Sequence, residues 1–175
     1  MMLEQISEAL PGYAKDLKLN LSSVFNQPEL TAQQTWGTAV AAALASRNPG
    51  LYRAILTEAE KNLSPEALEG AKAAAAVMGM NNIYYRFQHL VENEKYSTIP
   101  ARLRMNVMRT HGTDPVDFEL WSTAVSAVNG CGKCIVAHEK VLQSKGITVE
   151  TIAASVRIAS VLHAVAAVLD AENLN

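Results

Sequence analysis

The sequence predicts an all-α fold, and three features of its pattern support this. No run of four or more residues alternates between apolar and polar side chains between turns, so strand signals are nearly absent. Alanine is the commonest filler, and it favours helices and their close approach. Caps, prolines and glycines divide the chain at helical intervals. We therefore expect one compact all-α domain over residues 1–175, with about eight to ten helices.

Each expected helix has apolar residues three or four positions apart, and most have a start or stop signal. Pro11-Gly12 ends the first, and Pro28 fits the first turn of the third. Asn48-Pro49-Gly50 reads as a turn before the fourth helix. The expected helices lie at about residues 3–10, 13–25, 28–46, 51–61, 65–89, 115–129, 131–145 and 148–171, with a short one within 103–108 and a loop at 92–100.

The later helices carry the clearest boundary signals. Ser64 is an N-cap residue followed by a proline at the first helical position. Thr113 or Asp114 can cap the helix that starts near Pro115, and Thr148 opens the last helix. Gly146 closes the helix before it.

One segment is echoed 51 residues further along the chain. Gly79-Met80-Asn81-Asn82-Ile83 lies over Gly130-Cys131-Gly132-Lys133-Cys134, and both follow an alanine-rich helix that a proline starts. The echo is short, but it indicates an internally duplicated helical motif in which one half keeps the chemistry.

Composition and charge exclude several classes of function. Hydrophobic residues make up 49% of the chain, enough to form a core, so disorder is excluded. A net charge of −2 without a basic cluster argues against nucleic-acid binding. The N-terminus resembles no secretory signal, and the uninterrupted apolar runs are far shorter than the roughly 20 residues of a membrane span. We expect a cytoplasmic protein without a membrane segment.

The two cysteines, Cys131 and Cys134, form a Cys-x-x-Cys pair, with His138 four residues beyond the second. On a helix, positions 131, 134 and 138 share one face. In a reducing compartment such a pair is more often catalytic or metal-binding than a structural disulfide. The spacing therefore predicts an oxidisable dithiol beside a proton acceptor.

Three features could lower the thiol pKa from its usual value of about 8.5. Gly130 places Cys131 at a helix start, where backbone N–H groups favour negative charge. Lys133 adds a nearby cation, and His138 can accept a thiol proton. If the preceding helix packs antiparallel, Glu119 can reach His138 and orient it, completing a nucleophile, base and orienting residue.

Less specific interpretations apply to other residues of these types. Zinc is disfavoured because a structural site needs four ligands and the chain has only two cysteines; the set that could form such a site is Cys131, Cys134, His138 and Glu119. The remaining histidines are expected at the surface or satisfied in the core, and four methionines are expected to be core packing: His89, His111 and His163; Met78, Met80, Met105 and Met108.

The stretch FELWSTAVSAVNGCGKCIVAHE resembles the signature of the alkyl hydroperoxide reductase D family, lipoyl-dependent peroxiredoxins in the carboxymuconolactone decarboxylase-like superfamily. The order is a glutamate, the Cys-x-x-Cys pair and then a histidine, here Glu119, Cys131, Cys134 and His138. YAKDLKLNLSS, MGMNNIYYR and LRMN are also similar to that family. The resemblance covers essentially the whole chain.

The resemblance implies a homotrimeric, all-helical antioxidant peroxidase with no tightly bound cofactor and no metal. In it, Cys134 is the peroxidatic thiol that becomes a sulfenic acid, and Cys131 is the proton donor and resolving thiol that closes the Cys131–Cys134 disulfide. Glu119 and His138 form the proton relay.

The resemblance also implies partners. The family reduces a C-type peroxiredoxin through a mixed disulfide. Dihydrolipoamide on a lipoylated 2-oxo acid dehydrogenase component re-reduces its own disulfide, with dihydrolipoamide dehydrogenase and NADH upstream.

The chain departs from the family at one position, because Lys133 stands where many members have a histidine. A helper role for that histidine does not carry over, although Lys133 could stabilise a thiolate. The two lines of reasoning also disagree about the nucleophile. The helix terminus favours Cys131 as the more acidic thiol, whereas the resemblance and the register of His138 favour Cys134.

Two other functions stay open at this point. A decarboxylase of the wider superfamily could use Glu119 and His138 as acid and base without the cysteines. A helical oligomerisation or adaptor module could carry cysteines that only report redox state. The first predicts turnover without thiols, and the second predicts ordinary thiols that peroxide does not consume.

Overall fold

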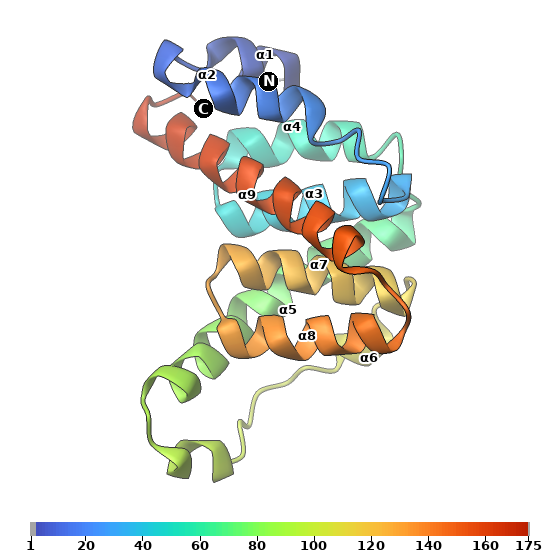
Figure 1. Ribbon diagram of the computed structural model, residues 1–175, viewed down its shortest axis with the longest axis vertical. Coiled ribbons are helices and arrows are strands. Elements are labelled where there is room, and N and C mark those ends of the chain that lie inside the picture. Colours follow the sequence, from blue (N-terminus) through green and yellow to red (C-terminus); the bar gives the residue numbers. More distant parts are fainter. Residues whose placement is uncertain (1–2, 175) are drawn as a thin grey trace.

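In the computed structural model, which describes residues 3–174, every regular element is a helix (Figure 1). The prediction of an all-α fold is confirmed. The elements are α1 (Leu3–Ala9), the 3-10 helix η1 (Gly12–Ala14), α2 (Lys15–Ser23), α3 (Ala32–Ser46), α4 (Pro49–Ala59), α5 (Pro65–Leu90), the 3-10 helix η2 (Glu94–Thr98), α6 (Val107–Thr110), α7 (Pro115–Val128), α8 (Gly132–Ser144) and α9 (Val149–Ala171).

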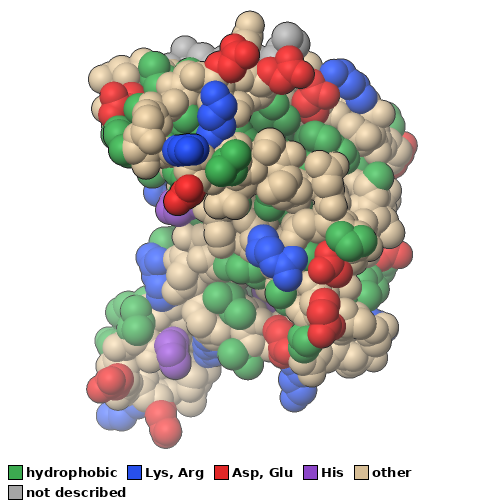
Figure 2. Space-filling view, turned by 45° about the horizontal axis from the view of Figure 1, so that its top comes forward, with side chains coloured by type: hydrophobic (Ala, Val, Ile, Leu, Met, Phe, Trp, Pro, Cys, Tyr) green, Lys and Arg blue, Asp and Glu red, His purple; other side chains and the backbone are tan. Residues whose placement is uncertain are grey.

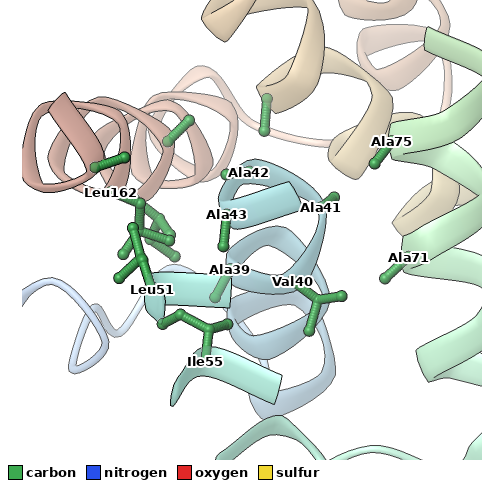
Figure 3. Close-up of a cluster of buried hydrophobic side chains, with 14 of the residues drawn as sticks. Ala39, Val40, Ala41, Ala42, Ala43, Leu51, Ile55, Ala71, Ala75 and Leu162 are labelled. Carbon is green, nitrogen blue, oxygen red and sulfur yellow. The ribbon is translucent and has the colours of Figure 1, made fainter. Parts of the chain in front are cut away.

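Helix α3 lies at the centre of the core and contacts α4, α5, α7 and α9. Its run Ala39–Ala43 is completely buried, which small side chains allow on all sides of a helix. Figure 3 shows these residues between Leu51 and Ile55 of α4, Leu162 of α9, and the alanines of α5. Helices from both halves of the chain therefore share one core.

A glycine sets the distance between α3 and α7. A Cβ atom at Gly37 would lie 2.2 Å from the ring of Trp121, a side chain that is completely buried. Glycine is therefore required at this crossing, because real Cβ atoms do not approach other atoms so closely. The crossing fixes α7, which carries Glu119, against the core.

Two boundaries differ from the sequence prediction. Pro28 does not open the third helix; α3 starts at Ala32, because Thr31 and Gln34 form a capping box that satisfies its first N–H groups. Asn48 is not part of a free turn either. Its side chain accepts a hydrogen bond from the Leu51 N–H, so Pro49 is already the first residue of α4.

The later boundaries are confirmed. Ser64, Asp114 and Thr148 cap α5, α7 and α9 as expected. Two short elements lie elsewhere than predicted: α6 begins only at Val107, and the expected loop after α5 contains η2.

The echoed segments differ locally. Helix α5 continues without interruption through Gly79, whereas Gly130 separates α7 from α8. A hydrogen-bonded turn with a positive φ forms only at the second position.

The C-terminal end of α5 and η2 project from the helical body (Figure 1). The exposed apolar side chains in this part are Ile83, Phe87, Leu90, Tyr96 and Ile99. On the face drawn in Figure 2, acidic and basic side chains are interspersed, with apolar side chains between them.

Helix α9 is the one helix among residues 3–174 that is long and apolar enough to cross a membrane by length and composition. The prediction from uninterrupted runs missed it, because His163 interrupts the apolar run but not the helix. Half of the apolar window is buried in this fold, against α3 and α7 among others. A core helix passes the same test, so this is weak evidence for a membrane segment.

Candidate functional site

The turn between α7 and α8 positions the first cysteine. Gly130 has φ +67°, and the Gly130 and Cys131 N–H groups donate to the carbonyls of Ala127 (3.1 Å) and Ser126 (3.0 Å). This is a Schellman motif, in which the left-handed glycine closes one helix. Cys131 is the residue after that glycine and also the N-cap of α8. It therefore precedes the helix rather than lying on its face.

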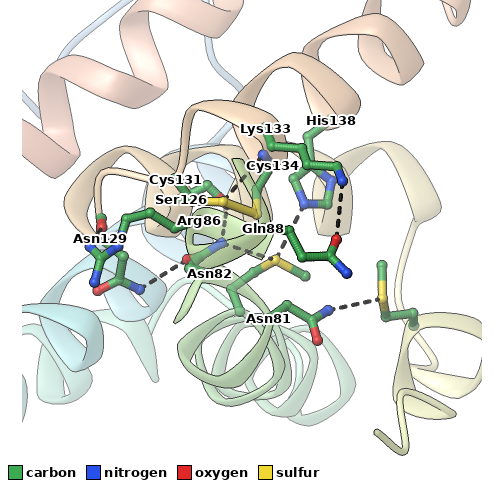
Figure 4. Close-up of a disulfide and its surroundings, with 12 residues drawn as sticks. Asn81, Asn82, Arg86, Gln88, Ser126, Asn129, Cys131, Lys133, Cys134 and His138 are labelled. Atoms are coloured by element: carbon green, nitrogen blue, oxygen red, sulfur yellow. Dashed lines mark hydrogen bonds between the residues drawn. A yellow bond between two sulfur atoms is a disulfide. The ribbon is translucent and has the colours of Figure 1, made fainter. Parts of the chain in front are cut away.

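The two cysteines form a disulfide, as expected (Figure 4). The Cys131 sulfur also accepts a hydrogen bond from the Cys134 N–H at 3.3 Å, the usual contact of an N-cap side chain. Cys131 is completely buried, whereas Cys134 is 6% exposed. Cys134 lines a cavity whose walls do not include Cys131.

His138 and Glu119 come together as the sequence predicts. Helices α7 and α8 pack as an antiparallel pair, and Glu119 Oε2 lies 2.7 Å from His138 Nδ1. The side chains are 22% and 9% exposed, respectively, so bulk water screens this contact only in part. His138 follows Cys134 by one helical turn. The Glu119–His138 pair can therefore hold or move a proton beside the sulfurs.

A methionine sulfur contacts the other ring nitrogen of His138. Met78 Sδ of α5 lies 3.3 Å from His138 Nε2, and it also accepts a contact from Asn82 Nδ2 at 3.9 Å. The sequence analysis assigned Met78 only to core packing. It is indeed buried, at 1% exposure, but its sulfur belongs to the site.

Helix α5 also holds the turn that carries Cys131. Asn82 Nδ2 donates to Ser126 Oγ at 2.9 Å, and Asn129 Nδ2 donates to Asn82 Oδ1 at 3.0 Å. Arg86 Nη1 donates to the Asn129 carbonyl. Figure 4 shows Asn82 and Arg86 reaching from α5 to this turn. The i, i+4, i+8 spacing of 78, 82 and 86 is the one sequence signal that could have indicated this shared helical face.

The cavity beside Cys134 has a volume of about 230 Å³ and mostly apolar walls. Its lining residues come from α5, the 105–108 segment and α8: Met78, Asn81, Tyr85, Met105, Met108, Lys133, Cys134, Ala137 and His138. Sequence reasoning missed the contribution of α5 and of the segment before α7. A small apolar molecule that entered the cavity would meet Cys134 and the imidazole together.

Lys133 contacts groups other than the cysteines. Its ammonium donates to Gln88 Oε1 at 3.1 Å and lies 5.6 Å from the centroid of the Tyr85 ring. The side chain is exposed at the rim of the cavity.

The remaining histidines lie outside the site. His111 stacks on Phe118 with 4.1 Å between ring centroids, and His89 and His163 are exposed, as expected. Among residues 3–174, no group of three or more His, Cys, Asp or Glu residues is placed to hold a metal ion.

Known proteins are similar to this sequence over nearly its full length. The model of the Carboxymuconolactone decarboxylase family matches residues 95–174. A protein of Acidobacterium capsulatum described as "Alkyl hydroperoxide reductase AhpD" is 61% identical, over 100% of this chain and 96% of its own length. Proteins with the same description from Solibacter usitatus and Streptomyces coelicolor are 59% and 55% identical, each over 98% of this chain and 97% of its own length.

Proposed function

The chain belongs to the alkyl hydroperoxide reductase AhpD family, and from this we propose that it is an oxidoreductase that reduces alkyl hydroperoxides with Cys131 and Cys134. The observation that carries the proposal is the disulfide at the wall of an apolar cavity, with the His138–Glu119 pair beside it. An oxidisable pair, a proton carrier and room for an alkyl group then lie together.

In the reduced protein, the Cys134 thiolate attacks the terminal oxygen of R–O–O–H. The O–O bond breaks, Cys134 becomes a sulfenic acid, and ROH leaves with a proton supplied through His138. Cys134 is assigned this role because it lines the cavity, whereas Cys131 is completely buried. Glu119 orients His138 and balances its charge. This geometry supports the assignment that the family resemblance gives.

Cys131 completes the cycle as the resolving thiol. Its sulfur attacks the sulfenic acid sulfur, hydroxide leaves with the thiol proton as water, and the disulfide forms. The balance is ROOH plus two thiols giving ROH, water and one disulfide. The partial positive charge at the N-terminus of α8 stabilises the Cys131 thiolate that must attack. The two lines of reasoning therefore point to different cysteines because they concern different steps: the helix terminus activates Cys131 for resolution, and the family assigns Cys134 the attack on the peroxide.

Dihydrolipoamide on a lipoylated 2-oxo acid dehydrogenase component is the proposed reductant. One of its thiolates attacks the Cys134 sulfur at the cavity wall, and Cys131 leaves as a thiolate that accepts the Cys134 N–H. The second lipoyl thiol then releases Cys134, so two electrons pass to the protein and a lipoyl disulfide forms. The apolar cavity suits the hydrocarbon part of a lipoyl group.

A C-type peroxiredoxin is the proposed protein substrate. The Cys134 thiolate would attack the partner's disulfide, and Cys131 would resolve the mixed disulfide, leaving the partner reduced. Replacing Cys131 with serine should therefore trap a covalent complex between the two proteins, which non-reducing electrophoresis detects.

We further propose a cytoplasmic homotrimer. The support for assembly is the projecting end of α5 and η2, where Phe87 is 49% exposed and Leu90 is 67% exposed. Such a row of apolar side chains is typical of a surface that a second copy covers. Light scattering at micromolar concentration should give three times the mass of 18.9 kDa.

The activity is tested with cumene hydroperoxide and a dihydrolipoamide-regenerating system. We expect steady peroxide consumption by the parent protein and loss of at least about 10³-fold in Cys134→Ser, as for removal of a catalytic nucleophile. A Cys134→Ser protein that is as active as the parent would refute the proposal.

The family model's description keeps a decarboxylase as the second candidate. The Glu119–His138 pair could act as acid and base on a lactone acid without sulfur chemistry. Turnover of such a substrate by a protein with both cysteines changed to serine would favour this candidate.

A further inference from the structure

In the disulfide form, both ring nitrogens of His138 have partners, and neither partner is a cysteine. Within the described residues, Nδ1 contacts Glu119 Oε2 at 2.7 Å and Nε2 contacts Met78 Sδ at 3.3 Å. A thioether sulfur can only accept a hydrogen bond, so Nε2 carries the hydrogen in this contact. This holds whether the proton between Glu119 and His138 is on the carboxylate oxygen or on Nδ1.

The Met78 sulfur is held in place from two sides. Met78 is buried at 1% exposure, and Asn82 Nδ2 points to its sulfur at 3.9 Å. Asn82 is itself completely buried and is fixed by Ser126 and Asn129. The sulfur thus contacts both the Asn82 amide and the His138 ring, two side chains that Figure 4 labels. The contact is therefore part of a fixed network rather than the chance position of a flexible side chain.

The chemistry of the cysteines changes this contact between the two redox states. Cys134 and His138 line the same cavity as Met78 and lie one helical turn apart. In the disulfide, Cys134 sulfur carries no charge and is a poor acceptor. After two-electron reduction it becomes a thiolate, and charge-assisted hydrogen bonds are about twice as strong as neutral ones. The thiolate then competes with the thioether for Nε2–H.

We propose that Met78 is a positioning residue that holds His138 Nε2–H while the disulfide is closed and gives it up to the Cys134 thiolate when the disulfide opens. The Met78 contact thus stabilises the oxidised form selectively. This inference rests on the proposed dithiol function of Cys131 and Cys134. It adds a third group to the Glu119–His138 pair. The equilibrium between the dithiol and the disulfide then depends on a side chain of α5.

The test is Met78→Leu, which nearly conserves volume and removes the acceptor. The protein is equilibrated with reduced and oxidised glutathione, and the fraction of disulfide is measured by mass spectrometry after acid quenching and alkylation. Losing one hydrogen bond from the oxidised form should lower the equilibrium constant for disulfide formation about fivefold. The reduction potential then becomes less negative by about 20 mV, since tenfold corresponds to about 30 mV.

Met105→Leu is the matched control, because Met105 lines the same cavity but its sulfur, unlike that of Met78, accepts no hydrogen bond among the described residues. We expect its potential to stay within about 5 mV of the parent, which is less than a twofold change. Equal potentials for Met78→Leu and Met105→Leu, or a shift of Met78→Leu to more negative values, would overturn the proposal.

A second measurement uses the parent protein and so does not depend on how the variant folds. Nitrogen-15 NMR of the histidine rings should show a hydrogen on His138 Nε2 close to the Met78 methyl group in the disulfide form. Reduction should weaken that proximity. A bare Nε2 in the disulfide form contradicts the inference. Neither measurement uses a peroxide, so a failed peroxidase assay and a failed Met78 test are separate results.

Discussion

The charge of Glu119 should control the rate of peroxide reduction through His138. Glu119→Gln keeps the side chain's size and an oxygen that can accept from Nδ1–H, but removes the negative charge. The parent contact is 2.7 Å long, with 22% of Glu119 and 9% of His138 exposed. The change therefore isolates the charge-assisted part of one partly buried hydrogen bond.

The size of the effect follows from the energy of that bond. A hydrogen bond to a charged group contributes about 1.5–3 kcal/mol, and roughly half of this depends on the charge. Partial exposure reduces this charge-dependent half, so about 1 kcal/mol is expected for Glu119→Gln, which is about fivefold in kcat/KM. Glu119→Ala removes the whole contact and should cost about 100-fold.

The assay is the initial rate of cumene hydroperoxide consumption with dihydrolipoamide in excess. Glu139→Gln is the control, because it makes the same charge change beside His138 on a side chain that bonds Gln143 instead. We expect its kcat/KM to stay within twofold of the parent. Equal rates for Glu119→Gln and the parent, or equal losses for the two glutamine variants, would refute the reasoning about the proton relay.

Three further changes test the packing, the turn and the rim of the cavity. Gly37→Ala places a Cβ 2.2 Å from the Trp121 ring and should lower Tm by about 4–8 °C, whereas Gly79→Ala in open space should leave Tm unchanged or raise it; equal values would contradict the packing argument. Asn82→Ala removes the partner of the buried Ser126 hydroxyl and of the partly buried Asn129 amide, so it should lower the unfolding free energy in urea by about 2 kcal/mol, and an unchanged midpoint would contradict this. Lys133→Gln should change kcat/KM less than threefold, because its ammonium is bound by neutral groups at the rim; a 100-fold loss would instead give it a direct role at the sulfur.

Much of the fold followed from local signals in the sequence. Ser64-Pro65, Asp114-Pro115 and Thr148 are caps whose effect depends on neighbouring residues alone, and each begins a helix in the structure. Pro28 was misread, since a proline fits both a first helical turn and a turn outside a helix. The capping box of Thr31 and Gln34 decides between them.

Part of the candidate site could likewise be predicted from local sequence patterns. Helical spacing placed His138 one turn after Cys134, and Cys131 meets them as the N-cap of the same helix. Glu119 needed only an antiparallel neighbour helix. The family resemblance rather than spacing supplied their proposed roles.

Met78, Asn82 and Met108 could not be assigned to the site from the sequence. They come from α5 and α6, and Met78 and His138 are 60 residues apart in the sequence. Their position depends on how α5 packs across α7 and α8, which no local pattern specifies.

The central claim is that Cys134 attacks the peroxide and that the buried Cys131 resolves the product. Dimedone, which traps sulfenic acids, is added with cumene hydroperoxide to Cys131→Ser and to Cys134→Ser, and peptide mass spectrometry locates the adduct. We predict an adduct on Cys134 in the first protein and no adduct in the second. An adduct on Cys131 in the second protein, with Cys134 unmodified in the first, would contradict the claim.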